Sequence, residues 1–169
     1  MNSSKSATMN QSPQSDAGRA AHAPLELEHF LPYRLSILSN TVSQAIADDY
    51  QKRHDLGVTE WRVMAVLARF PGLSAREVAQ RTAMDKVAVS RALARLVDDG
   101  RVDRSVHADD KRRSVLRLSA SGWRIHDDIA PLARSRERAL LAQLSADERV
   151  WLTRILDKLL AGDKAGATR

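Results

Sequence analysis

The chain has 169 residues, of which 43% are hydrophobic and 28% charged, a composition typical of a soluble protein with one core-forming domain. It contains no cysteine, which excludes disulfides and thiolate metal sites, and its aromatic share of only 4% favours aliphatic helices over an aromatic-rich sheet. The net charge of +6 favours an anionic partner, and residues 86–117 hold nine Lys or Arg against five Asp, a net of +4.

The N-terminal part of the chain changes character near residue 25. Residues 1–24 are rich in Ser, Ala, Asn and Gln without an apolar run, so we expect a disordered tail, no signal peptide or membrane span, and a cytoplasmic protein. From there on, apolar residues recur every three or four positions. Because proline is best tolerated in the first turn of a helix, we predict a long helix from about Pro32 to Lys52, with 25–31 as a turn or short helix before it.

The next segment has the signals of two helices and a tight turn. Thr59 is a candidate N-cap for a helix over 60–69, which Pro71-Gly72 ends. Ser74 and Glu77 have the spacing of a capping box, which predicts a short helix over 75–81.

Residues 86–98 are predicted to form a further helix with two different faces. Asp85 can cap its start and Gly100 can supply a left-handed stop after its end. One face is an apolar stripe, and the other is small and basic, as close approach to a DNA groove requires. The stripe consists of Val89, Leu93 and Leu96, and the outward face of Lys86, Ala88, Arg91 and Arg95.

A β-hairpin and two more helices complete the chain. The pattern has a period of two around Val102–Val106 and Leu116–Leu118, and the hairpin tip at 107–113 carries three consecutive cations. Helices are then predicted over 123–144 and, after a capping box at Ser145 and Glu148, over 149–160. The terminal helices have more apolar face than one small subunit covers, which predicts a homodimer.

These elements together predict a mostly α fold with a small β-hairpin wing, in which a winged helix-turn-helix is flanked by N- and C-terminal dimerisation helices. We expect a single domain over 25–163, with dimerisation helices in 25–53 and 120–163 around the winged helix-turn-helix at 57–119, and a disordered tail at 164–169. Two short helices with a basic second helix can read a major groove, and an arginine-tipped hairpin can reach the adjacent minor groove.

Several motifs, in order and spacing, carry a family resemblance. They are Leu73–Arg81, Asp85–Arg91, Leu96–Gly100, Arg104, Asp110-Lys111-Arg112, Leu116–Ser119 and Gly122. With these motifs, residues 32–160 resemble the MarR family of bacterial regulators. The resemblance implies a dimer whose recognition helices lie about one DNA turn apart on a pseudo-palindromic operator. It also implies repression, and release from DNA when a small aromatic or phenolic acid binds between the dimer and DNA-binding regions.

The predicted DNA-binding residues lie on three segments. Those expected to face base edges or to lie beside them on the recognition helix are Lys86, Val87, Ala88, Ser90 and Arg91. Those expected to hold phosphates are Ser74 and Arg95, and Arg76 is a further predicted DNA-binding residue. In the wing, the resemblance places Arg112 in the minor groove with Asp110 orienting it, and adds Lys111 and Arg113. The alternatives are that Arg91 and Arg95 are solvated helix residues, that Asp110 is an ordinary turn residue, and that Ser74 acts as a cap.

The effector site is predicted less directly. His29, Tyr33 and Trp61 are the candidates, with core or dimer packing as the alternative. Residues 29–40 look similar to regulators of aromatic-acid and nicotinate-type catabolism, so we expect a small aromatic carboxylate as effector. We predict no cofactor and no metal site, because the adjacent residues His126, Asp127 and Asp128 point in different directions on a helix.

The sequence contains no motif that is typical of an enzyme, and we predict that the protein is not one. Two other classes of function stay open: a winged-helix module that binds protein and has a basic wing only incidentally, and an enzyme with an unrecognised site. A steep salt dependence of binding distinguishes DNA from a protein partner.

Overall fold

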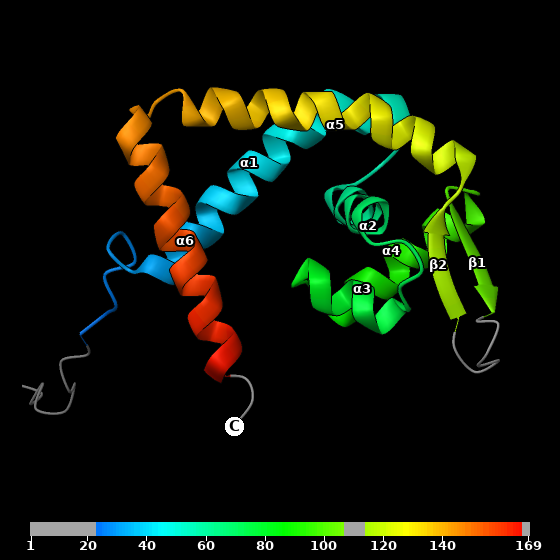
Figure 1. Ribbon diagram of the computed structural model, residues 1–169, viewed down its shortest axis with the longest axis horizontal. Coiled ribbons are helices and arrows are strands. Elements are labelled where there is room, and N and C mark those ends of the chain that lie inside the picture. The colour runs from blue at the N-terminus through cyan, green and yellow to red at the C-terminus, as the bar shows by residue number, and fades with distance from the viewer. Residues whose placement is uncertain (1–22, 107–113, 167–169) are drawn as a thin grey trace, which may run out of the picture. The chain divides into compact units, whose positions relative to one another are not determined.

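The computed structural model describes residues 23–106 and 114–166, and it confirms the mostly helical fold with one antiparallel hairpin (Figure 1). In chain order the elements are α1 (Leu31–His54), α2 (Val58–Arg69), α3 (Ala75–Thr82), α4 (Lys86–Asp98), β1 (Val102–Val106), β2 (Ser114–Leu118), α5 (Ala120–Leu141) and α6 (Ala146–Gly166). The described residues up to Ser36 belong to one compact unit, and those from Ile37 onward belong to a second, which contains the core. Within the described ranges, no helix is long and apolar enough to cross a membrane.

The core lies between α2, α4, the sheet and the first turns of α5. Helix α4 buries its predicted apolar stripe, and α2 faces it with three fully buried side chains. Tyr50 of α1 and Ile129 of α5 are also buried. The buried residues of α2 and α4 include Val63, Met64, Leu67, Val89, Leu93 and Leu96.

Helix α2 begins differently from the prediction. Its N-cap is Gly57, with no side-chain cap, so the assignment of Thr59 as the cap was wrong and Thr59 lies inside the first turn. Two features move the start toward the N-terminus. Leu56 is only 1% exposed, and Asp55 turns the chain with a left-handed φ of 46°. The end is as predicted, at Arg69, with Gly72 at a φ of 86° in the following turn.

The predicted caps of α3 and α4 are confirmed. The Ser74 hydroxyl accepts from the amide of Glu77 at 3.3 Å, and the Glu77 carboxylate accepts from the amide of Ser74 at 2.8 Å. The Asp85 carboxylate accepts from the amides of Val87 and Ala88, both at 3.0 Å. These bonds satisfy amides that a helix leaves without intrahelical partners, so the start of each helix is encoded locally.

The hairpin pairs Val102 with Leu118 and Val106 with Ser114. The segment before α3 joins it, because Leu116 donates its amide to the Leu73 carbonyl at 2.9 Å. The sheet therefore attaches directly to the start of the helix-turn-helix. The hairpin tip, with Asp110, Lys111, Arg112 and Arg113, lies outside the described residues.

The two C-terminal helices differ from the prediction at their ends. Helix α5 starts at Ala120 rather than Trp123, because the Ser119 hydroxyl accepts from the amide of Gly122 at 3.0 Å and caps it. It stops at Leu141 rather than Leu144. The predicted capping box of α6 is present, with the Ser145 amide donating to Glu148 at 2.8 Å. Helix α6 then continues to Gly166, beyond the predicted end at residue 160.

Candidate nucleic-acid interface

The outward face of α4 combines cations with small side chains. Lys86, Ser90 and Arg91 are exposed, and Val87 is 56% exposed, whereas Ala88 is half-buried. The opposite face is anchored in the core, so the helix cannot turn this surface inward without losing its packing. A helix with this surface can bring its backbone close to bases while two cations face phosphate or base edges.

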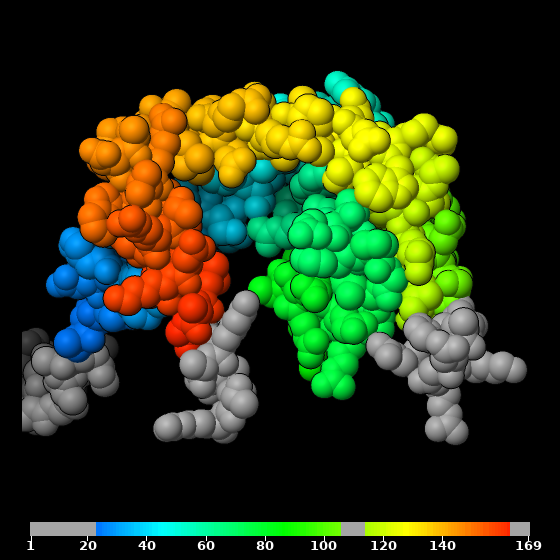
Figure 2. Space-filling model, in the orientation of Figure 1, coloured from blue at the N-terminus to red at the C-terminus, as the bar shows by residue number. Residues whose placement is uncertain are grey.

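A shallow groove runs between α3 and α4. It is lined by Ala75, Arg76, Ala79, Gln80, Lys86 and Ser90. The side chains of α3 and α4 form one continuous face, beside the described ends of the hairpin strands (Figure 2). Arg76, Lys86 and Arg91 form no ion pair with any of the residues that the structure describes. Their charges are therefore available to a ligand with negative charge.

A second groove separates α4 from the hairpin and contains a cation that the prediction did not include. Its lining residues come from α3, α4 and both strands, and include Ser90, Asp98, Arg104 and Ser114. The period-two pattern places Arg104 on the same side as Val102, which is buried, yet Arg104 is exposed. In the sequence, Arg104 follows the buried Val102 by two residues, so both are expected on the same side of the strand. This spacing could have indicated that Arg104 lies at the edge of the groove.

Comparison with known proteins places this geometry in a family. Residues 54–113 match the model of the MarR family. The HTH-type transcriptional repressor Mb2911 of Mycobacterium bovis is 30% identical over 145 residues, which cover 84% of this chain and 97% of that protein. The chain belongs to the MarR family. It is therefore a winged helix-turn-helix transcriptional regulator.

Two further comparisons cover large parts of the chain. The homoprotocatechuate degradative operon repressor of Escherichia coli is 26% identical over 110 residues, 65% of this chain and 74% of that protein. The crystal structure of a mutant MarR from Escherichia coli complexed with operator DNA is 25% identical, with a TM-score of 0.68, and the match covers 82% of this chain and 99% of that one.

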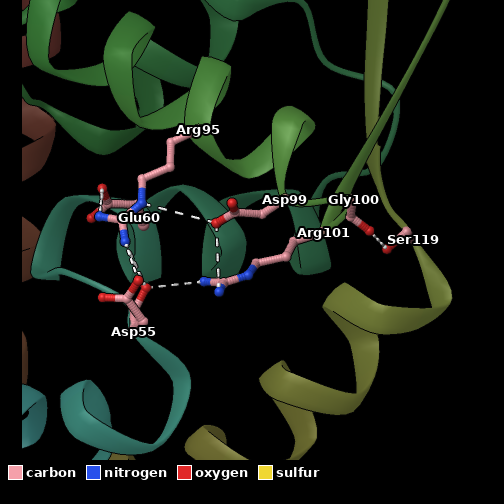
Figure 3. A network of polar contacts seen from close by, with 7 residues as sticks. All are labelled: Asp55, Glu60, Arg95, Asp99, Gly100, Arg101 and Ser119. Atoms are coloured by element: carbon pink, nitrogen blue, oxygen red, sulfur yellow. Dashed lines mark hydrogen bonds and ion pairs between the residues drawn. The ribbon is translucent and has the colours of Figure 1, made fainter.

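Arg95 forms hydrogen bonds within the chain, whereas the sequence predicted that it contacts a DNA phosphate. Its guanidinium donates to the carboxylate of Asp55 at 2.7 Å and to the Asp55 carbonyl at 3.1 Å. Glu60 and Asp99 lie 3.7 and 3.9 Å away, and Figure 3 shows Arg95 among these carboxylates. The hydrogen bond from Arg95 to Asp55, followed by the nearby negative charges, raises the pKa of the guanidinium above its ordinary value. We therefore leave Arg95 out of the proposed DNA contacts.

Ser74 has its hydroxyl committed within the chain. It donates to the Glu77 carboxylate at 2.6 Å while it accepts from the Glu77 amide. The capping role expected as the alternative is thus present, and a phosphate near this helix start would meet the exposed Arg76 and the first backbone amides rather than a free hydroxyl proton.

The predicted effector residues fall in different settings. Trp61 packs in an aromatic group, with ring centroids 6.0 Å from Tyr50 and 5.8 Å from His126. His29 lies 3.5 Å from Glu26, and Tyr33 is 42% exposed; both belong to the unit that precedes Ile37. The contacts of Trp61 fit the packing alternative.

Arg62 makes a contact between helices that was not predicted from the sequence. This residue of α2 reaches α1, where its guanidinium donates to the Ser43 hydroxyl at 2.6 Å. No short-range pattern identifies such a pair, because 19 residues separate the partners. No group of three or more His, Asp or Glu that could hold a metal ion occurs within residues 23–106 and 114–166.

Proposed function

We propose that the chain is a repressor that binds operator DNA as a homodimer, with α4 in the major groove. The observation that carries this proposal is the outward face of α4, where Lys86 and Arg91 are exposed without an internal ion pair in the described chain. Lys86, Val87 and Arg91 face the base edges, and the exposed Arg76 holds the phosphate backbone.

The wing adds a minor-groove contact. From the Asp-x-Arg pattern, Arg112 enters the groove and Asp110 orients it, with Lys111 and Arg113 beside them. Arg104, at the described base of the wing, lines the groove next to α4 and extends the same basic surface. Together, α4 and the wing contact adjacent grooves of one duplex.

The dimer is proposed from the apolar surface of the terminal helices. Helix α6 exposes large apolar side chains along several turns, an unusual surface for a monomer. A second copy would cover this face and set two recognition helices about one turn apart on a pseudo-palindromic operator. The exposed side chains include Val150, Trp151, Ile155, Leu159 and Leu160.

Release from DNA is proposed to follow the binding of a small aromatic carboxylate. The support is the relative from Escherichia coli that represses a homoprotocatechuate degradative operon, together with the resemblance of residues 29–40 to regulators of aromatic-acid and nicotinate-type catabolism. His29 and Tyr33 stay the residues proposed to contact it, whereas the packing of Trp61 against Tyr50 and His126 favours a structural role for that ring. Such a ligand can change how much operator is bound only if it has different affinities for two conformations of the protein, one that binds DNA and one that does not.

The experiment that tests operator binding uses duplexes selected from a random pool and fluorescence anisotropy at several salt concentrations. Binding through several phosphates should weaken steeply with salt, whereas a module for protein partners would give a flat response. At fixed salt, Arg112→Ala should lower affinity by about 1–3 kcal/mol, while Arg124→Ala, which removes an exposed cation on α5, should not. Equal affinity of the Arg112 variant and the wild type contradicts the wing assignment.

A further inference from the structure

We propose that Arg101 is a positioning residue for operator binding: it fixes the recognition helix α4 to the end of α1 and the start of α5, and thereby sets which spacing of half-sites the dimer accepts. The proposal rests on the proposed function, because half-site spacing matters only to a dimer that reads two half-sites with α4. Arg101 lies in the short link between α4 and β1. The end of α1, α4 and the start of α5 all belong to the compact unit that begins at Ile37.

The backbone of Arg101 joins the end of α4 to the start of α5. Its amide donates to the Leu96 carbonyl at 2.8 Å, after Gly100 has turned the chain with a φ of 66°, an arrangement that closes the last turn of a helix. Its carbonyl accepts from the amide of Ser119, the N-cap of α5, at 3.1 Å. A Cβ added to Gly122 would overlap this carbonyl oxygen, so the first turn of α5 packs directly on Arg101.

The side chain of Arg101 reaches the end of α1. Its Nη1 donates to the Asp55 carbonyl at 3.3 Å, and its Nη2 lies 3.5 Å from the Asp99 carboxylate (Figure 3). Asp55 directly follows His54, the last residue of α1, and has a left-handed φ of 46°. The side chain of Arg101 is only 14% exposed. Because a largely buried guanidinium is costly unless its donors are bonded, Arg101 has few alternative positions.

Arg95 contacts the same aspartate but constrains the fold less. The side chains of Arg95 and Asp55 are 44% and 89% exposed, so water screens their ion pair and competes for its hydrogen bonds. An exposed ion pair of this kind contributes little and can rearrange at small cost. The largely buried Arg101 has no such freedom. We therefore assign the positioning role to Arg101 and not to Arg95.

Helices α1 and α5 are also joined to each other. Arg136 of α5 forms two hydrogen bonds with the Asp49 carboxylate of α1, both at 2.7 Å. Nearer the end of α1, the His54 ring contacts the Asp128 carboxylate of α5 at 2.7 Å. The two helices thus form one frame, which we call the α1–α5 frame. Arg101 attaches α4 to both helices of this frame, so a change of its side chain alters how α4 is held on the frame and leaves the contacts within the frame intact.

The attachment of α4 to the α1–α5 frame determines how well a dimer tolerates a change in half-site spacing. A change of one base pair moves a half-site by about 3.4 Å along the duplex and turns it by roughly 35° about the duplex axis. If α4 is held firmly, the complex can follow that change only by deforming the DNA or straining the protein, and both reduce affinity. A looser attachment lets α4 follow the displaced half-site. Arg101 therefore makes the dimer selective for one spacing.

The test measures, by fluorescence anisotropy at fixed salt, the affinity of the full-length chain for the selected operator and for two duplexes with the same half-sites spaced one base pair closer or farther apart. We expect the wild type to bind the altered duplexes about tenfold more weakly, a loss similar to that from a mismatched base pair. For Arg101→Gln this ratio should fall to about threefold or less. Arg124→Gln, an equal charge change at an exposed residue of α5, should keep the wild-type ratio, and Arg95→Gln should keep most of it.

The ratio between spacings distinguishes positioning from a general loss of stability. A variant that only destabilises the fold binds all three duplexes more weakly by the same factor, so a wild-type ratio in Arg101→Gln overturns the proposal. A wild type that binds the three duplexes equally overturns it as well. Arg101→Lys keeps the charge but not the geometry of the guanidinium, so its ratio should be intermediate, and it replaces the glutamine variant if that variant does not fold.

The same titrations separate this proposal from the proposed function. If the wild type binds operator and the variants of Arg101 keep its preference for one spacing, only the positioning role is wrong. If the wild type binds no operator, the proposed function is wrong.

Discussion

The N-cap of the recognition helix allows stability and DNA binding to be separated at one residue. In Asp85→Ala, the amides of Val87 and Ala88 lose the carboxylate that accepts both at 3.0 Å. Loss of an N-cap costs about 1 kcal/mol, within a range of about 0.5–2. For a domain of this size, that corresponds to a fall in Tm of roughly 2–4 °C, measured at fixed protein concentration because dimerisation also contributes to the transition.

Asp85→Asn is the matched control, because asparagine keeps an acceptor oxygen and caps about as well as aspartate. It should lose only the interaction of the negative charge with the helix dipole, about 0.5 kcal/mol. It also removes a negative charge from the end of α4 that we place in the DNA groove, so its operator affinity should exceed that of the wild type. If both variants lose the same stability, or if Asp85→Ala unfolds at the wild-type temperature, the capping argument is refuted.

Three further predictions concern other parts of the fold. Arg91→Gln should reduce operator affinity by about 1–3 kcal/mol in anisotropy titrations, whereas Arg95→Gln, which disrupts the acidic network but no proposed DNA contact, should change it far less; equal losses would return Arg95 to the interface. Gly122→Ala should lower Tm markedly in thermal unfolding, because a Cβ there would meet a backbone carbonyl oxygen that cannot move aside, and a wild-type Tm would show that α5 can start elsewhere. Hydrogen bonds to the Asp128 carboxylate from His54 and then from Arg53 lower the pKa of Asp128 below the ordinary value for aspartate, so this interaction stabilises the fold above that ordinary value and is lost as the pH falls through the lowered pKa. The Tm difference between wild type and Asp128→Asn should therefore shrink in acid, and a constant difference would contradict the assignment.

The parts of the fold that could be predicted from the sequence are those that nearby residues determine. The capping oxygens of Ser74 and Asp85 lie two or three residues from the amides that they bind, so the starts of α3 and α4 follow from a short window. The start of α2 could not be predicted in this way. It depends on the burial of Leu56 and the left-handed Asp55, and a threonine in a plausible cap position misled the prediction.

The same distinction between local and distant determinants applies to the candidate site residues. Lys86 and Arg91 were assigned correctly to the exposed face of α4, because the helical period places them opposite the apolar stripe. Arg95 shares that face in sequence, but its partner Asp55 is 40 residues away. Arg62 and Ser39 are 23 residues apart. Such pairings depend on tertiary packing, which a single sequence does not contain.

The claim that α4 reads DNA is tested most directly by the salt dependence of operator affinity for wild type and for the double variant Lys86→Ala, Arg91→Ala. We predict that the double variant binds more weakly and that the slope of log K against log salt becomes shallower by up to about 2, roughly one unit for each phosphate that the variant no longer neutralises. Its preference for operator over random duplex should also fall. A double variant with the affinity, salt slope and sequence preference of the wild type would contradict the account.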